Sequence, residues 1–131
     1  MLKSATKNLL GWVEPEKGEN IMTNDTAALN AAKEKLKSAG IEFIQVEVTE
    51  LDGAQRGKLV TLDKGLGGDV GFSSVLFGLT TADDVWESPF TSFENGFLDY
   101  FARPQAETVR VLPWRDATAS VICDFTTPMA R

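Results

Sequence analysis

β-branched and aromatic residues concentrate in residues 41–49, and a second extended run follows at residues 58–62. Between these runs, Gly53 can take the positive φ that a tight turn often needs, and Asp52 can hydrogen-bond its own backbone. This pattern predicts a strand, a turn and a second strand, which together form a β-hairpin. Four charged side chains gather at one end of it: Glu50, Asp52, Arg56 and Lys58.

A helical pattern precedes the hairpin. Residues 27–39 are rich in strong helix formers, and Asn24, Asp25 or Thr26 can cap the start. Gly40 stands where a left-handed C-terminal residue belongs. The apolar stripe is narrow and shallow, so we expect the helix to pack on the outside of a sheet, with its lysines in water.

Two further strands are predicted at residues 108–112 and 119–125, joined by a loop that contains Pro113 and Asp116. Strand alternation puts Cys123 on one face with Ala119, Val121 and Phe125. We interpret Cys123 as a small buried hydrophobe, because the chain has no histidine to activate a thiolate. About four strands and one covering helix predict an α+β domain with a mixed sheet.

The middle of the chain is less regular. Residues 63–69 contain three glycines but lack the order of a phosphate-binding loop, so they predict a plain flexible loop. Residues 71–80 read as a short extended apolar segment, and residues 81–96 as a long polar loop. Trp86, Phe90 and Phe93 either pin this loop to its own core or mark an interface.

Composition narrows the classes of protein. The 131 residues fit one domain, and the net charge of −6 with no basic stripe argues against nucleic acid as a partner. Cys123 is the single cysteine, so no internal disulfide forms and a reducing, cytoplasmic location is expected. No apolar run approaches the length of a membrane span, and no cluster of carboxylates predicts a metal site.

The two ends of the chain read differently from its centre. Residues 1–22 lack the features of a secretory signal and are interpreted as a disordered tail or an over-called translation start. The alternative is a small docking element built on Leu9, Leu10, Trp12 and Val13. We assign residues 23–126 to the folded domain and residues 127–131 to the start of a linker.

Two blocks of sequence carry a family resemblance. Residues 98–114 read LDYFARPQAETVRVLPW, and residues 117–124 read ATASVICD. They resemble the end of the N-terminal β-grasp domain of the glutamine synthetase family, where a Pro and a Thr precede a strand, a Pro-Trp pair and a strand ending in Cys-Asp. The hairpin up to Lys58, with its acidic residue, glycine turn and Gly-Lys pair, is similar to the family's opening hairpin.

The resemblance implies roles for three residues. Glu50 corresponds to the acidic residue, usually Asp, that helps bind ammonium at a neighbouring subunit's active site. Ser73 and Ser74 lie where ammonia-using members carry an Asp-Gly-Ser-Ser loop and a following Trp, but the Asp-Gly pair and the Trp are absent here. Residues 74–79 look closer to relatives that ligate glutamate to polyamines or other amines.

The resemblance also implies what this stretch lacks. The family's metal ligands for Mg or Mn, its ATP site and its glutamate-binding arginines lie in a larger catalytic domain expected after Arg131. We therefore expect a domain that is not catalytic alone and binds no cofactor. Its expected partner is the catalytic domain of its own or a neighbouring subunit, in a homo-oligomer that forms γ-glutamyl amides. The alternative is a free-standing β-grasp module that binds proteins through a sheet edge or the 81–96 loop. Exposed aromatic residues there predict self-association at high concentration.

Overall fold

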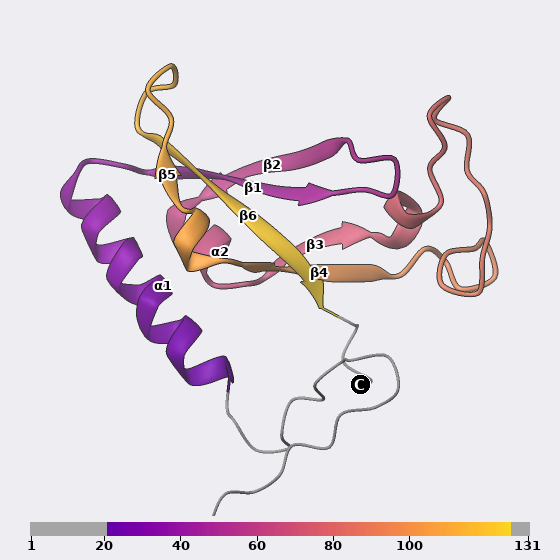
Figure 1. The fold of residues 1–131 in the computed structure, drawn as a ribbon, viewed down its shortest axis with the longest axis horizontal. Coiled ribbons are helices and arrows are strands. Elements are labelled where there is room, and N and C mark those ends of the chain that lie inside the picture. The colour runs from indigo at the N-terminus through magenta and orange to yellow at the C-terminus, as the bar shows by residue number, and fades with distance from the viewer. Residues whose placement is uncertain (1–20, 127–131) are drawn as a thin grey trace, which may run out of the picture.

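The computed structural model describes residues 21–126, and the predictions for residues 1–20 and 127–131 lie outside this part (Figure 1). Helix α1 (Ile21–Ser38) begins before the predicted caps and takes in the last two residues assigned to the tail. It ends as predicted, because Gly40 has φ of 76° and the Ile41 N–H donates to the Leu36 carbonyl oxygen at 3.0 Å. Lys33 and Lys37 pair with Asp63, and these hydrogen bonds hold the pKa of Asp63 below its usual value.

The sheet is built around a parallel pair of its first and last strands. Strand β1 (Phe43–Thr49) pairs antiparallel with β2 (Gln55–Thr61) and parallel with β6 (Thr118–Thr126). Strand β4 (Asp99–Pro104) joins β6 to β3 (Val70–Ser73), and β5 (Arg110–Val111) also pairs with β6. The main path is therefore β2-β1-β6-β4-β3. The α+β class with a mixed, β-grasp-like sheet is confirmed, but the sheet has six strands rather than about four.

Some local predictions were wrong. Residues 63–69 do not form a plain loop, because α2 (Leu62–Leu66) occupies most of them. A Cβ on Gly65 would collide with Ile44, so the glycine lets this short helix lie against the sheet. The extended apolar segment ends at Ser73, where the 3₁₀ helix η1 (Ser74–Phe77) begins. Only Arg110–Val111 of the strand predicted at 108–112 pairs, because the 3₁₀ helix η2 (Ala106–Thr108) precedes it.

The core lies between the sheet and the helices. Ile44, Val46, Ala119 and Val121 are fully buried in it. The sheet curls so that its two edge strands approach each other: Lys58 Nζ of β2 donates to the Gly71 carbonyl oxygen of β3 at 2.6 Å. Helix α1 lies at one end of the molecule, while the 81–96 loop projects from the other (Figure 1).

Candidate functional site

Glu50 follows β1 directly and opens the hairpin turn. Its N–H donates to the Ala54 carbonyl oxygen at 3.0 Å, and the turn has the predicted features: Gly53 has φ of 87° and Asp52 Oδ1 accepts from the Ala54 N–H at 2.9 Å. The Glu50 side chain is 0% exposed. Glu50 is therefore not the solvated carboxylate that a hairpin end would ordinarily carry.

Arg56 on β2 holds this buried carboxylate. Its Nε and Nη2 donate to the same oxygen, Oε1 of Glu50, at 2.9 and 2.8 Å. Nη2 also donates to Asp83 Oδ1 in the 81–96 loop at 3.2 Å. The hydrogen bond to Glu50, followed by its negative charge, raises the pKa of the Arg56 guanidinium, so Arg56 stays charged.

The second carboxylate oxygen of Glu50 is the unusual feature of the site. Oε2 is buried and has no hydrogen-bond partner among the described residues. Buried polar atoms are normally paired, because leaving one unpaired costs about 1–3 kcal/mol. An oxygen left unpaired at this cost is a candidate acceptor for a ligand or for a group supplied by a partner.

Ser73 and Ser74 stand at the start of η1, at the same end of the molecule as the hairpin turn (Figure 1). Ser73 has a structural role: its Oγ accepts from the Val75 N–H at 3.3 Å and donates to the Phe97 carbonyl oxygen at 3.2 Å. Ser74 is fully buried, and its Oγ has no partner within the described part of the chain. No hydrogen bond joins either described serine to Glu50, so their shared role stays a prediction.

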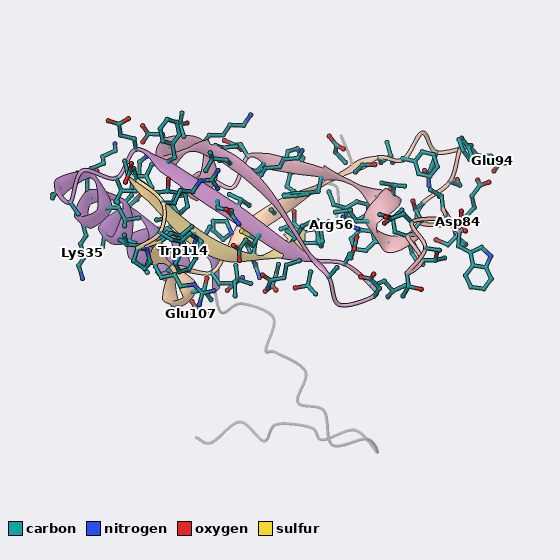
Figure 2. The ribbon with its side chains drawn as sticks, turned by 90° about the horizontal axis from the view of Figure 1, so that it is seen from above. Lys35, Arg56, Asp84, Glu94, Glu107 and Trp114 are labelled. Carbon is teal, nitrogen blue, oxygen red and sulfur yellow. The ribbon has the colours of Figure 1, made fainter. Side chains whose placement is uncertain are left out.

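The 81–96 loop is held by polar groups at its turns. Ser92 and Asn95 bond each other's backbone, and Glu87 Oε2 accepts from the Phe93 N–H at 2.9 Å. Trp86, Phe90 and Phe93 are 79%, 70% and 75% exposed, so the alternative that they pin the loop to its core is wrong. Figure 2 shows Asp84 and Glu94 at this end, and Lys35 and Trp114 at the opposite end.

The structure adds Arg56 and Asp83 to the predicted site residues. Arg56 was visible in the sequence as one of the charges at the hairpin end, but Asp83 lies 27 residues further along the chain. One feature of the sequence does point to an acidic partner for Arg56 in the stretch that contains Asp83. Residues 65–102 contain six acidic residues and no Lys or Arg.

Other chemistry is limited in the described residues. They contain no group of three or more His, Cys, Asp or Glu placed to hold a metal ion. Cys123 is buried as predicted, and burial raises the pKa of its thiol to about 12, so it carries no thiolate near neutral pH. Within residues 21–126, no helix has both the length and the apolar character to span a membrane.

Comparison with known proteins identifies the family. Over 95 residues the chain is 32% identical to the glutamate–isopropylamine ligase of Pseudomonas sp, a match that covers 69% of this chain and 21% of the ligase. Over 99 residues it is 30% identical to type-1 glutamine synthetase 2 of Dictyostelium discoideum, covering 70% of this chain and 18% of that protein. The chain is an N-terminal domain of the glutamine synthetase family.

Solved structures agree with this assignment. A GmaS–ADP complex superposes with a TM-score of 0.55 at 25% identity, and ligand-free GmaS with 0.54 at 26%. Each match covers 74% of this chain and 20% or 21% of the GmaS chain. No family model matches the chain. The chain thus spans about a fifth of the curated glutamine-synthetase-family relatives that it matches.

Proposed function

We propose that this domain serves a ligase that forms a γ-glutamyl amide from glutamate and ammonia or an amine at the expense of ATP. In this proposal the hairpin end and the start of η1 face the catalytic domain of the same or a neighbouring subunit. The domain contributes to the amine side of the site and is not catalytic alone. The observation that carries the proposal is the buried Glu50 carboxylate, with one oxygen held by Arg56 and the other unpaired.

Glu50 suits an ammonium or alkylammonium ion chemically. A carboxylate oxygen accepts short, charge-assisted hydrogen bonds from N–H groups. Arg56 holds Oε1, which leaves Oε2 to receive the cation. Because Oε2 is enclosed in this chain, an amine reaches it only when the hairpin turn or the 81–96 loop shifts. Assembly with a catalytic domain would supply that change.

The rest of the reaction belongs to the larger part of the ligase. The described residues contain no group of three or more His, Cys, Asp or Glu placed to hold a metal ion, so in this proposal Mg or Mn and ATP bind in the catalytic domain. We further propose that the ligase is oligomeric, is located in the cytoplasm and acts in nitrogen metabolism. Residues 74–79, with their looser version of the family's serine loop, favour an amine larger than ammonia, such as a polyamine.

The test is an assay of the chain expressed with the coding sequence that follows residue 131. γ-Glutamyl amide formation is measured with ammonia, isopropylamine and polyamines, for the wild type, Glu50→Gln and the matched control Asp52→Asn. Asp52 is an exposed carboxylate in the same turn, so its loss should leave the KM for the amine unchanged. Glu50→Gln should raise the KM for the amine but not for glutamate or ATP. Wild-type kinetics in an assembled Glu50→Gln enzyme would contradict the proposal.

A second candidate function rests on the exposed aromatic residues of the 81–96 loop. Large apolar side chains exposed in one loop are typical of a protein-binding surface, so the alternative is that the domain acts as a free-standing binding module. Sedimentation over a range of concentrations should then show self-association that Trp86→Ser weakens. Trp114→Ser is the matched control, because Trp114 is 78% exposed at the opposite end of the molecule. A monomer at every concentration would contradict self-association through this loop.

A further inference from the structure

Two cationic side chains of strand β2 contact residues that lie later in the chain than the hairpin. Arg56 donates a hydrogen bond to Asp83 in the 81–96 loop. Lys58 Nζ donates to the Gly71 carbonyl oxygen and lies 4.8 Å from the centroid of the Phe72 ring. Only Arg56 also contacts Glu50. We propose that Arg56 is a positioning residue that couples the Glu50 carboxylate to the 81–96 loop. This inference rests on the proposed function for its role in ligation, but not for the coupling itself.

The contacts at Glu50 explain why an arginine is needed. Nε and Nη2 both donate to Oε1 from one planar group, which orients the carboxylate, and Oε2 has no partner among the described residues. A lysine offers one flexible ammonium and cannot grip Glu50 through two nitrogens while reaching a second acceptor. The Glu50 side chain is 0% exposed with Arg56 in place, so removing the guanidinium takes away the charged partner of this buried carboxylate.

The contact at Asp83 ties the same guanidinium to the loop. Asp83 has φ of 60°, a left-handed conformation that few residues other than glycine adopt easily. Thr80 closes the turn around it, because its Oγ1 accepts from the Ala82 and Asp84 N–H groups at 3.3 and 3.2 Å. The turn therefore fixes the backbone at Asp83, and the Asp83 carboxylate accepts from Arg56 Nη2 at 3.2 Å.

The two contacts share one nitrogen, so they depend on each other. A partner surface that moves the 81–96 loop would pull Asp83 away from Nη2 and leave that nitrogen wholly to Glu50. Conversely, a cation on Oε2 would repel the guanidinium and weaken its hold on the loop. Such coupling is reciprocal by thermodynamic linkage. Loop docking and amine binding would then regulate each other through Arg56.

The first test follows amide hydrogen exchange in this chain and needs no catalysis. Arg56→Met should speed exchange in residues 50–54 and 80–84 severalfold while β1 and β6 stay protected. Arg56→Lys should restore neither segment fully. Lys58→Met, the matched control, should loosen residues 70–73 and leave 80–84 as in the wild type. Unchanged exchange at 80–84 in Arg56→Met would overturn the coupling, whatever the chain's function.

Asp83→Asn supplies a second variant in case Arg56→Met fails to fold. Asp83 is 76% exposed, so this change leaves the core intact and should loosen 80–84 while 50–54 keeps its protection. In the assembled ligase, Arg56→Met should raise the KM for the amine on the order of tenfold to a hundredfold with glutamate and ATP unaffected. If exchange changes as expected but neither Glu50→Gln nor Arg56→Met alters that KM, the positioning role in ligation falls with the proposed function.

Discussion

This domain uses apolar residues in opposite ways in the core of its sheet, here called the core end, and in the 81–96 loop, here called the loop end. At the centre of the sheet, Ile44, Val46 and Val121 are 0% exposed, because alternate positions on paired strands all face the helices. In the 81–96 loop, Trp86 and Phe90 are larger than any of these, yet they are 79% and 70% exposed. The core is held by burial, whereas the loop is held by hydrogen bonds that serine, asparagine and glutamate side chains accept from its backbone N–H groups.

This difference separates stability from recognition. Apolar groups that are buried stabilise the fold, and exposed ones leave their transfer free energy to be gained on binding. Arg56 links the two regions, because it lies on edge strand β2, next to the central strand β1, and its guanidinium contacts Asp83 in the loop. Substitutions at the core end should therefore change the free energy of unfolding, and those at the loop end should mainly change local order or binding.

The largest expected effect is at Ile44. Ile44→Ala removes a fully buried side chain from the centre of the sheet and should lower the free energy of unfolding by about 2–5 kcal/mol. Phe90→Ala, which removes more atoms from the exposed loop, should change it by less than about 0.5 kcal/mol. Urea unfolding of both variants measures the contrast. Equal losses would mean that the loop aromatics contribute to the core after all.

The next effect in size is at Gly65 in α2. A Cβ there would meet side chains of Ile44, Val60 and Val46, so Gly65→Ala should overpack the core and cost about 1–3 kcal/mol. The change also favours helix formation, which opposes the loss only in part. Lys64→Ala in the same helix is the control, because Lys64 is exposed and has no such contacts to lose. A stabilised Gly65→Ala variant would show that α2 can move off the sheet.

The elements that local chemistry dictates could be predicted from the sequence. The hairpin, the Gly53 turn, the end of α1 at Gly40 and the inward face of β6 each depend on residues next to one another, and each prediction is confirmed. Strand β4 was missed because Asp99–Pro104 mixes charged, aromatic and proline residues without alternation. It becomes a strand by pairing with β3 and β6, which lie far away in the sequence.

The candidate site shows the same difference between features set by neighbouring residues and features set by distant contacts. Glu50 was found through the family resemblance, but its burial was not, because burial depends on how the later parts of the chain close over the hairpin. The Arg56–Asp83 contact spans 27 residues and leaves no periodic signal. Pairwise contacts between loops of this kind are set by the tertiary fold, so sequence patterns alone could not supply them.

Cys123 allows a smaller, pH-dependent test of the core end. Burial raises the pKa of its thiol from an ordinary value of 9.0 to about 12. Below about pH 9 both folded and unfolded states keep the proton, while above it the unfolded state ionises first, so stability falls as the pH rises. The wild type should therefore lose more of its urea midpoint between about pH 7 and about pH 10 than Cys123→Ala does. Parallel losses in the two proteins would mean that the thiol is not buried from solvent.

The smallest expected effect on global stability is at Asn95 in the 81–96 loop. Asn95 Oδ1 accepts from the Ser92 and Phe97 N–H groups at 3.2 and 3.0 Å, so Asn95→Ala removes two hydrogen bonds that shape the loop. Each is worth about 0.5–1.5 kcal/mol locally, yet the loop can open without exposing the core. Amide exchange should accelerate in residues 92–97 while the global free energy of unfolding stays within about 0.5 kcal/mol of the wild type. Ser38→Ala, which removes a side-chain hydrogen bond at the α1 end, controls for an unspecific change. If Asn95→Ala lowered the global free energy as much as a core variant, the loop and the core would be one cooperative unit, and the contrast between the two ends would be wrong.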